Sequence, residues 1–180
     1  MPYGNVTLES VFKKYIDTIA HPIIALETGC SHLFVPENFT NLSTLNIVEH
    51  LIKPTNGLLY SLDNDADHIE VCRHELSVRD LDQYVHFLQG NSVDRIKGLG
   101  DEHKGTINFV WHDSLEDSDH AYEEFREVQR LLSSNHVICV DDYGTASVKW
   151  QKISNHMKIS HEYDFEEYHT PTGLFVGLKK

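Results

Sequence analysis

The sequence predicts a three-layer α/β sandwich, in which one sheet lies between two layers of helices. Short apolar runs alternate along the chain with segments whose apolar residues repeat at the helical period. Parallel strands need long crossover connections, and the intervening helices supply them. A chain of 180 residues is long enough to bury a full core and short for two domains. Because no linker or internal repeat interrupts the pattern, we expect a single domain over residues 1–180.

The first quarter of the chain sets this alternation. Residues 8–19 carry apolar side chains at the i, i+3, i+4 and i+7 positions of an amphipathic helix. Pro22 ends that helix, because proline disfavours helical geometry in the residue before it. The apolar run at 23–26 then predicts a buried strand. A second helix is expected over 43–52 and a second strand over 57–62.

The alternation continues through the middle of the sequence. The expected elements are a helix over 66–76, a strand over 84–88, a short helix over 93–96, a strand over 107–111, a helix over 122–132 and a strand over 136–140. The end of the chain differs. After a helix over 148–157, two strands are expected over 158–163 and 172–178, with only a short polar segment between them. That segment cannot hold a crossover, so these strands should form an antiparallel hairpin at one edge of the sheet.

The net charge of the chain limits the kinds of molecule that it is expected to bind. The chain has 15 Lys and Arg against 28 Asp and Glu, a formal net charge of −13. Such a field repels phosphate backbones, so we expect neither nucleic-acid nor anionic-membrane binding, and a small-molecule or cationic partner is favoured. No apolar stretch approaches the ~20 residues of a membrane span. Three cysteines without a Cys-x-x-Cys pair, and no basic and apolar leader pattern, predict reduced thiols in a cytoplasmic protein.

Polar residues gather where the predicted strands end, which is where ligands bind in open parallel sheets. Gly29 follows the first strand and would let a ligand approach the backbone, and Asp63 closes the second, where a carboxylate can accept both hydroxyls of an adenosyl ribose. The alternative is a plain turn at Gly29 and a helix cap at Asp63. Since the sequence lacks Gly-x-Gly-x-x-Gly, it favours an adenosyl ligand without a phosphate, such as S-adenosylmethionine.

The chain from about residue 23 to 144 resembles the class I S-adenosylmethionine-dependent methyltransferases, especially the methyltransferase 24 group and the relatives of macrocin O-methyltransferase. The resemblance is carried in order by Glu27-Thr28-Gly29, Leu62-Asp63, Gly90-Asn91-Ser92, Asp113 with Asp119-His120-Ala121-Tyr122, and Val140-Asp141-Asp142-Tyr143-Gly144. Two departures stand out. About ten residues, 33–42, separate the first motif from Ser43, and residues 115–118 separate Asp113 from Asp119.

The resemblance implies a Rossmann-like, seven-stranded, mostly parallel sheet and O-methylation of a small hydroxylated molecule such as a sugar or polyol. It implies His120 and Asp113 as candidate catalytic residues. The implied adenosylmethionine contacts are Glu27, Gly29, Ser31, Asp63, Asn91, Ser92 and His112.

A metal site can be argued from the acids alone. Asp113, Asp141 and Asp142 follow two apolar strands that should be neighbours, and three buried like charges need a compensating cation. Oxygen ligands suit Mg²⁺, with Mn²⁺ or Ca²⁺ as substitutes. The resemblance to the methyltransferases implies that such a metal would chelate vicinal substrate oxygens and lower the pKa of the attacking hydroxyl. Alternatively, the three acids cap loop backbone groups.

Two other functions stay open at this point. One is a binding or scaffold domain of the same fold that has lost transfer. The other is an iron hydroxylase with His112 and His120 as ligands. Substrate selectivity would come from residues 33–41, the loop after Asp113, residues 164–172 or a second subunit, and a homo-oligomer is compatible with the sequence.

Overall fold

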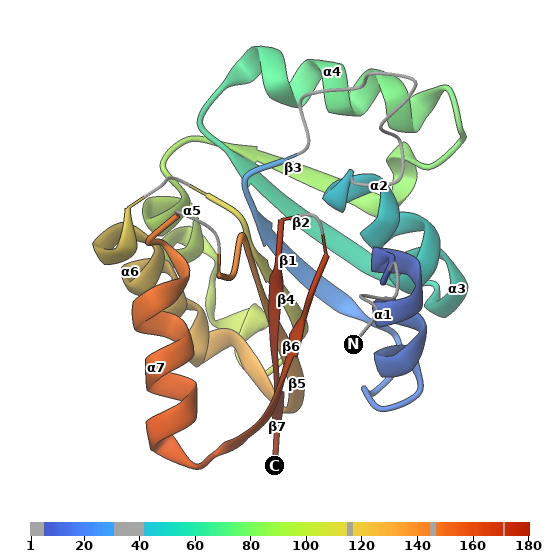
Figure 1. The fold of residues 1–180 in the computed structure, drawn as a ribbon. Helices are drawn as coiled ribbons and strands as arrows, with labels where there is room; N and C mark the ends of the chain where they lie inside the picture. Colours follow the sequence, from blue (N-terminus) through green and yellow to red (C-terminus); the bar gives the residue numbers. More distant parts are fainter. Residues whose placement is uncertain (1–5, 31–41, 115–116, 145–146, 171) are drawn as a thin grey trace.

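The computed structural model describes residues 6–30, 42–114, 117–144, 147–170 and 172–180. Its centre is a seven-stranded sheet with the order β3-β2-β1-β4-β5-β7-β6 (Figure 1). The first five strands run parallel to their neighbours, and β7 is antiparallel to both β5 and β6. The strands are β1 (Ile24–Thr28), β2 (Leu58–Asp63), β3 (Val85–Gln89), β4 (Ile107–His112), β5 (Leu132–Asp141), β6 (Tyr163–Tyr168) and β7 (Leu174–Lys179).

Helices cover both faces of the sheet, which confirms the predicted three-layer sandwich (Figure 1). One face carries α1 (Leu8–Ile16), α2 (Ser43–Ile47), a π-helical turn η2 (Val48–Ile52), α3 (Lys53–Thr55) and α4 (Ala66–Ser77). The other carries α5 (Ser92–Gly98), α6 (Ser118–Val128) and α7 (Trp150–Ser160). The 3₁₀ turns are η3 (Asp82–Tyr84), η4 (Asp101–His103) and η5 (Gln129–Leu131). No helix within the described ranges is long and apolar enough to cross a membrane.

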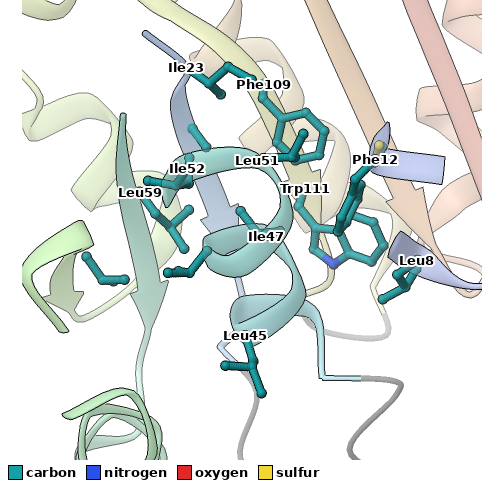
Figure 2. Packing of buried hydrophobic residues seen from close by; sticks show 14 of the residues in the cluster. Leu8, Phe12, Ile23, Leu45, Ile47, Leu51, Ile52, Leu59, Phe109 and Trp111 are labelled. Carbon is teal, nitrogen blue, oxygen red and sulfur yellow. The ribbon is translucent and has the colours of Figure 1, made fainter. Parts of the chain in front are cut away.

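Successive side chains of β4 point alternately into the two hydrophobic cores, one on each face of the sheet. Phe109 and Trp111 point to the α1 side, where the Phe12 ring meets each of them edge to face, with centroids 5.7 Å apart (Figure 2). Val110 points to the opposite core and packs with the buried face of α6. His112 follows the same alternation, and its ring lies 6.3 Å from that of Phe125 on α6. The strand therefore delivers a buried histidine to the α6 side at the end of the sheet where the parallel strands terminate.

The last predicted strand pair needs a correction. The hairpin exists, but the strand expected over 158–163 is wrong, because α7 continues to Ser160 and β6 spans Tyr163–Tyr168. Ile159, which suggested a strand, lies on the exposed side of α7 and is 75% exposed. β6 is an edge strand whose central residues are all exposed. It therefore lacks the buried apolar residues from which a strand can be predicted. The helix expected over 43–52 is divided into α2 and η2, and α3 continues it to Thr55.

Candidate active site at the strand ends

The parallel strands bring most of the predicted site residues to one edge of the sheet. Thr28, at the end of β1, pairs with Leu62 on one side and His112 on the other. Asp63 pairs with Gln89, and His112 pairs with Val140. The residues that follow these strands therefore share this edge, as the sequence predicted. Ser31 and the inserted segment 33–41 lie outside the residues that the structure describes.

Gly29 is required here for a reason other than the predicted one. Its backbone has φ +83°, and its N–H donates to the Leu62 carbonyl at 2.8 Å. A Cβ at this position would lie 2.2 Å from the Asp113 carbonyl oxygen. The Asp113 N–H in turn donates to the Thr28 carbonyl at 3.0 Å. The missing side chain therefore lets the first loop pack against the end of β4, and the contact of Gly29 with a cofactor stays a prediction.

Asp63 connects β2 to the first loop. One carboxylate oxygen accepts the Cys30 N–H at 3.1 Å, and the other accepts the Asp65 N–H at 2.8 Å. The cap of α4 is Asp65, whose side chain accepts from Asp67 and His68, so the alternative reading of Asp63 as the helix cap is wrong. The Asp63 side chain is 9% exposed. Each carboxylate oxygen can accept more than one hydrogen bond, so acceptor capacity remains beside the loop.

Glu27 lies beneath the first loop, with both oxygens engaged inside the protein. Ser43 donates to Oε1 at 2.7 Å, and Thr44 and Ser61 each donate to Oε2 at 2.8 Å. Its side chain is fully buried, and burial raises its pKa to about 7. Glu27 therefore ties the start of α2 to β1 and β2. The arrangement gives it a structural role, and its contact with a cofactor stays a prediction.

Asn91 and Ser92 begin α5 and have separate tasks. The Asn91 side chain is the helix cap and accepts the Asp94 N–H at 3.2 Å. The Ser92 hydroxyl is buried and donates to the carboxylate of Glu124. It also lies 3.0 Å from the His120 Nε2 atom. Ser92 thus points toward α6, and Asn91 fixes the start of the helix.

Glu124 is the centre of a buried cluster that the sequence reasoning missed. Thr28 and Ser114 donate to its Oε2 at 3.1 and 2.8 Å. His120 Nε2 lies 3.2 Å from Oε1, and His112 Nδ1 lies 3.6 Å from Oε2. Burial alone would raise the pKa of Glu124, but the neighbouring histidines outweigh it and lower this pKa to about 2. The available signal was a glutamate within the apolar stripe of a predicted helix.

The two predicted histidines both face Glu124. The His120 side chain is 17% exposed, and its hydrogen bond to Glu124 raises its pKa. His112 is 2% exposed, and neither ring nitrogen has a hydrogen-bond partner within the described part of the chain. Buried polar atoms are normally paired. Since Nδ1 faces Glu124, Nε2 is the ring nitrogen of His112 that is left for a ligand or a water.

The predicted three-carboxylate site contains a lysine. Lys149, just before α7, places Nζ 2.6 Å from Asp113 Oδ1 and 2.8 Å from Asp142 Oδ2. The third acid, Asp141, uses Oδ1 to accept the Asp142 N–H and the Thr172 hydroxyl, each at 2.8 Å. Burial favours the neutral amine, but Asp113 and Asp142 outweigh it and raise the pKa of Lys149. Burial and the charge of Asp141 raise the pKa of Asp113 to about 8, against the opposing effect of Lys149.

This arrangement does not fit the expected metal. The argument for Mg²⁺, Mn²⁺ or Ca²⁺ was that the acids need a compensating cation, and the ammonium of Lys149 provides one. Within the described ranges, no group of three or more His, Cys, Asp or Glu side chains is arranged to hold a metal ion. The predicted metal site at Asp113, Asp141 and Asp142 is therefore unsupported, and so is the iron site at His112 and His120.

Comparisons with known proteins agree with this fold. A structure of a methyltransferase from Geobacter sulfurreducens superposes with a TM-score of 0.71 at 14% identity, covering 96% of this chain and 75% of that one. An O-methyltransferase from Bacillus cereus in complex with SAH gives 0.69 at 16%, covering 96% and 79%. A candidate rRNA methylase from Clostridium thermocellum gives 0.71 at 13%, covering 100% and 98%. No curated protein matches the sequence.

The family is shown by the sequence itself. The model of the methyltransferase domain family Methyltransf_24 matches residues 42–143, which is more than half of the chain. The matched region runs from the start of α2 to the loop after β5, so it includes Asp63, Ser92, Asp113, Glu124 and Asp142. The chain belongs to the Methyltransf_24 family of methyltransferase domains.

Proposed function

We propose that this protein transfers a methyl group from S-adenosylmethionine to an oxygen of a small hydroxylated molecule. The family assignment and the SAH complex of the similarly folded Bacillus cereus O-methyltransferase support the cofactor. The observation that carries the proposal is one edge of the sheet, where Asp63 ends β2, His112 ends β4 and Ser92 begins α5, the helix that follows β3. Ligands of open parallel sheets bind at this edge.

The residues at this edge suit an adenosyl ligand. Asp63 has remaining acceptor capacity next to the first loop, which matches the two hydroxyls of a ribose. His112 lies on the α6 side, its Nε2 atom has no hydrogen-bond partner among the described residues, and His112 and Ser92 both contact Glu124. The chain carries no glycine-rich phosphate cradle, and adenosylmethionine needs none. When bound, this cofactor supplies a methyl group on a positively charged sulfur that leaves as a neutral thioether.

His120 is our candidate for the group that receives the acceptor's proton. As the hydroxyl oxygen forms its bond to the methyl carbon, the sulfur–carbon bond breaks, its electron pair stays on sulfur, and the hydroxyl proton must go to a base. His120 is partly exposed, and Glu124 favours its protonated form. Asp113, the other candidate, is held by Lys149. In this assignment Glu124 and Ser92 position the imidazole.

The charge of the protein favours a small acceptor over a nucleic acid. The candidate rRNA methylase shares the fold at 13% identity, which says nothing of the substrate. A net charge of −13 would oppose approach of a phosphate backbone. We therefore propose a small-molecule substrate, a cytoplasmic protein, and no role for nucleic acid or membrane. A domain that binds without transfer is the remaining alternative, and the assay below distinguishes it.

The cofactor is tested by titration calorimetry of adenosylmethionine and its thioether product with the full-length protein. We expect the Asp63→Asn variant to bind about tenfold to thirtyfold more weakly, because one charge-assisted acceptor is lost at a cost of about 2 kcal/mol. Asp67→Asn, an exposed position one turn into α4, is the matched control and should bind normally. No binding by the wild type at millimolar concentration would refute the function. Normal binding by a folded Asp63→Asn would remove only Asp63 from the site.

Transfer itself is followed by mass spectrometry on a panel of sugars, polyols and phenols. The expected product gains one methyl group, and an equal amount of the thioether product forms. Binding of the cofactor without transfer to any member of the panel, together with no stimulation by added RNA, would favour the non-enzymatic alternative.

A further inference from the structure

A buried lysine lies between carboxylates that would otherwise repel each other. Asp113 follows β4, Asp142 follows β5, and Lys149 precedes α7, so three segments contribute to the contact. The Lys149 side chain is only 4% exposed. Its Nζ also lies 3.5 Å from the Ser114 carbonyl oxygen. Burying an ammonium is costly unless carboxylates neutralise its charge, and the same holds for the carboxylates without the ammonium.

The ammonium and a divalent cation compete for the same space and the same charges. Nζ is within 2.8 Å of both Asp113 and Asp142, so an ion bridging these carboxylates would have to displace it. Mg²⁺ binds oxygen ligands at about 2.1 Å with nearly octahedral geometry, which the contacting lysine would obstruct. Two adjacent cations would also repel each other.

We propose that Lys149 is the resident cation of this site, in the place where a divalent metal would bridge Asp113 and Asp142. This inference rests on the proposed methyl transfer and extends it, because a site organised by an ammonium works without a divalent metal. It also removes the need for an acceptor with two adjacent oxygens, since chelation by a metal was the reason for that requirement. Lys149 is then a positioning residue that acts through the two carboxylates.

The first test measures metal binding, which a purely structural lysine would not affect. Full-length wild-type protein is titrated with MnCl2 by calorimetry, and its melting temperature is followed with MnCl2 against NaCl at matched ionic strength. We expect no specific binding and no specific shift. In Lys149→Met the carboxylates lose their cation, so Mn²⁺ should bind at least tenfold more tightly than to the wild type and raise the melting temperature.

Two variants control for charge and for folding. Lys149→Arg keeps a cation and should stay insensitive to Mn²⁺. Lys152→Met removes a lysine three positions later, within α7, whose partner Asp119 is exposed, and should gain no Mn²⁺ affinity. If Lys149→Met does not fold, the Mn²⁺ titration of the wild type tests the proposal instead. Mn²⁺ binding by the wild type that is lost in Asp141→Asn would overturn the proposal. A folded Lys149→Met that gains no affinity would overturn it as well.

The activity assay separates this inference from the proposed function. Methyl transfer by the wild type should be unchanged in excess EDTA, and transfer that needs added Mg²⁺ would overturn the inference while leaving the methyltransferase intact. Failure to bind adenosylmethionine would refute the proposed function. The metal titrations do not use the cofactor, so they would still decide the role of Lys149.

Discussion

At the strand ends, contacts between segments that are distant in sequence determine which residue can occupy a position. Gly29 illustrates this best, because the atom that excludes a side chain there belongs to Asp113 on another strand. The pairing of Thr28 with His112 brings the two loop backbones together. The glycine is therefore part of the sheet's architecture, and a ligand needs only the edge that this packing forms.

Gly29→Ala should destabilise the protein strongly. The new Cβ would lie 2.2 Å from a backbone carbonyl that cannot rotate away, at a φ of +83° that alanine rarely adopts. We expect the free energy of unfolding to fall by about 2 kcal/mol or more, measured by urea denaturation. Gly98→Ala is the matched control, because nothing lies within 4 Å of a Cβ built there. It should be neutral or slightly stabilising, and an equal loss at both positions would contradict the role given to Gly29.

The sequence could place side chains at the edge but could not assign their partners. The positions of Asp63, Asp113 and Asp142 follow from strand endings, which apolar runs reveal. Glu124 and Lys149 were missed because each acts across the fold. Glu124 meets Thr28, which is 96 positions away in sequence, and Lys149 meets Asp113 at a separation of 36. The charge argument correctly required a cation, and only the three-dimensional contact identifies it as a lysine.

At the scale of the elements, α2 is held to the sheet by buried hydroxyl and carboxyl groups as well as by apolar packing. Glu27 on β1 accepts hydrogen bonds from Ser43 and Thr44 in the first turn of α2 and from Ser61 on β2. Figure 2 shows Leu45, Ile47 and Leu51 from the same segment within the apolar cluster. The first turn of the helix therefore depends on a carboxyl group whose charge changes with pH.

Glu27→Gln should flatten part of the pH dependence of stability. The pKa of Glu27 is raised from its ordinary value of 4.5 to about 7, so between these values the folded protein holds a proton that the unfolded chain releases. Its contribution is therefore fully present below pH 4.5 and is lost as pH rises through 7, by on the order of 3 kcal/mol. Urea denaturation of both proteins from pH 5 to 8 measures the difference. Parallel curves would show that Glu27 is ionised throughout.

Helices and strands could be predicted from the sequence where burial makes their apolar residues recur at a regular spacing. Where an element is exposed, this spacing is lost and the prediction failed. Strands β1, β2 and β4 and the second half of β5 are buried and largely apolar, which made them predictable, and edge strand β3 keeps enough apolar residues to be recognised. The residues of edge strand β6 from Asp164 to Glu167 are exposed. Its pairing with β7 therefore gives the sequence no pattern of apolar residues that would predict a strand. The neighbouring helix α7 was shortened for the same reason, since Ile159 lies at its exposed side.

The whole molecule carries an excess of acidic groups that its ion pairs do not cancel. Exposed pairs such as Lys13 with Glu9 and Lys97 with Glu123 contribute little to stability, because water and salt screen them. Against them stands a formal charge of −13, which favours expansion of the chain through self-repulsion. The buried contact of Lys149 with Asp113 and Asp142 is shielded from solvent and is little affected by dissolved ions.

Moderate salt should therefore stabilise the protein. Raising NaCl from about 10 mM to about 200 mM shortens the Debye length from roughly 30 Å to below 10 Å, which screens repulsion among distant carboxylates. Salt also weakens the exposed ion pairs, but these are few and individually small, so the urea midpoint should rise at pH 8. The effect should shrink as the pH is lowered, because protonation reduces the net negative charge. A midpoint that falls with salt at pH 8 would mean that local ion pairs outweigh the net charge, and the electrostatic argument against polyanionic substrates would weaken with it.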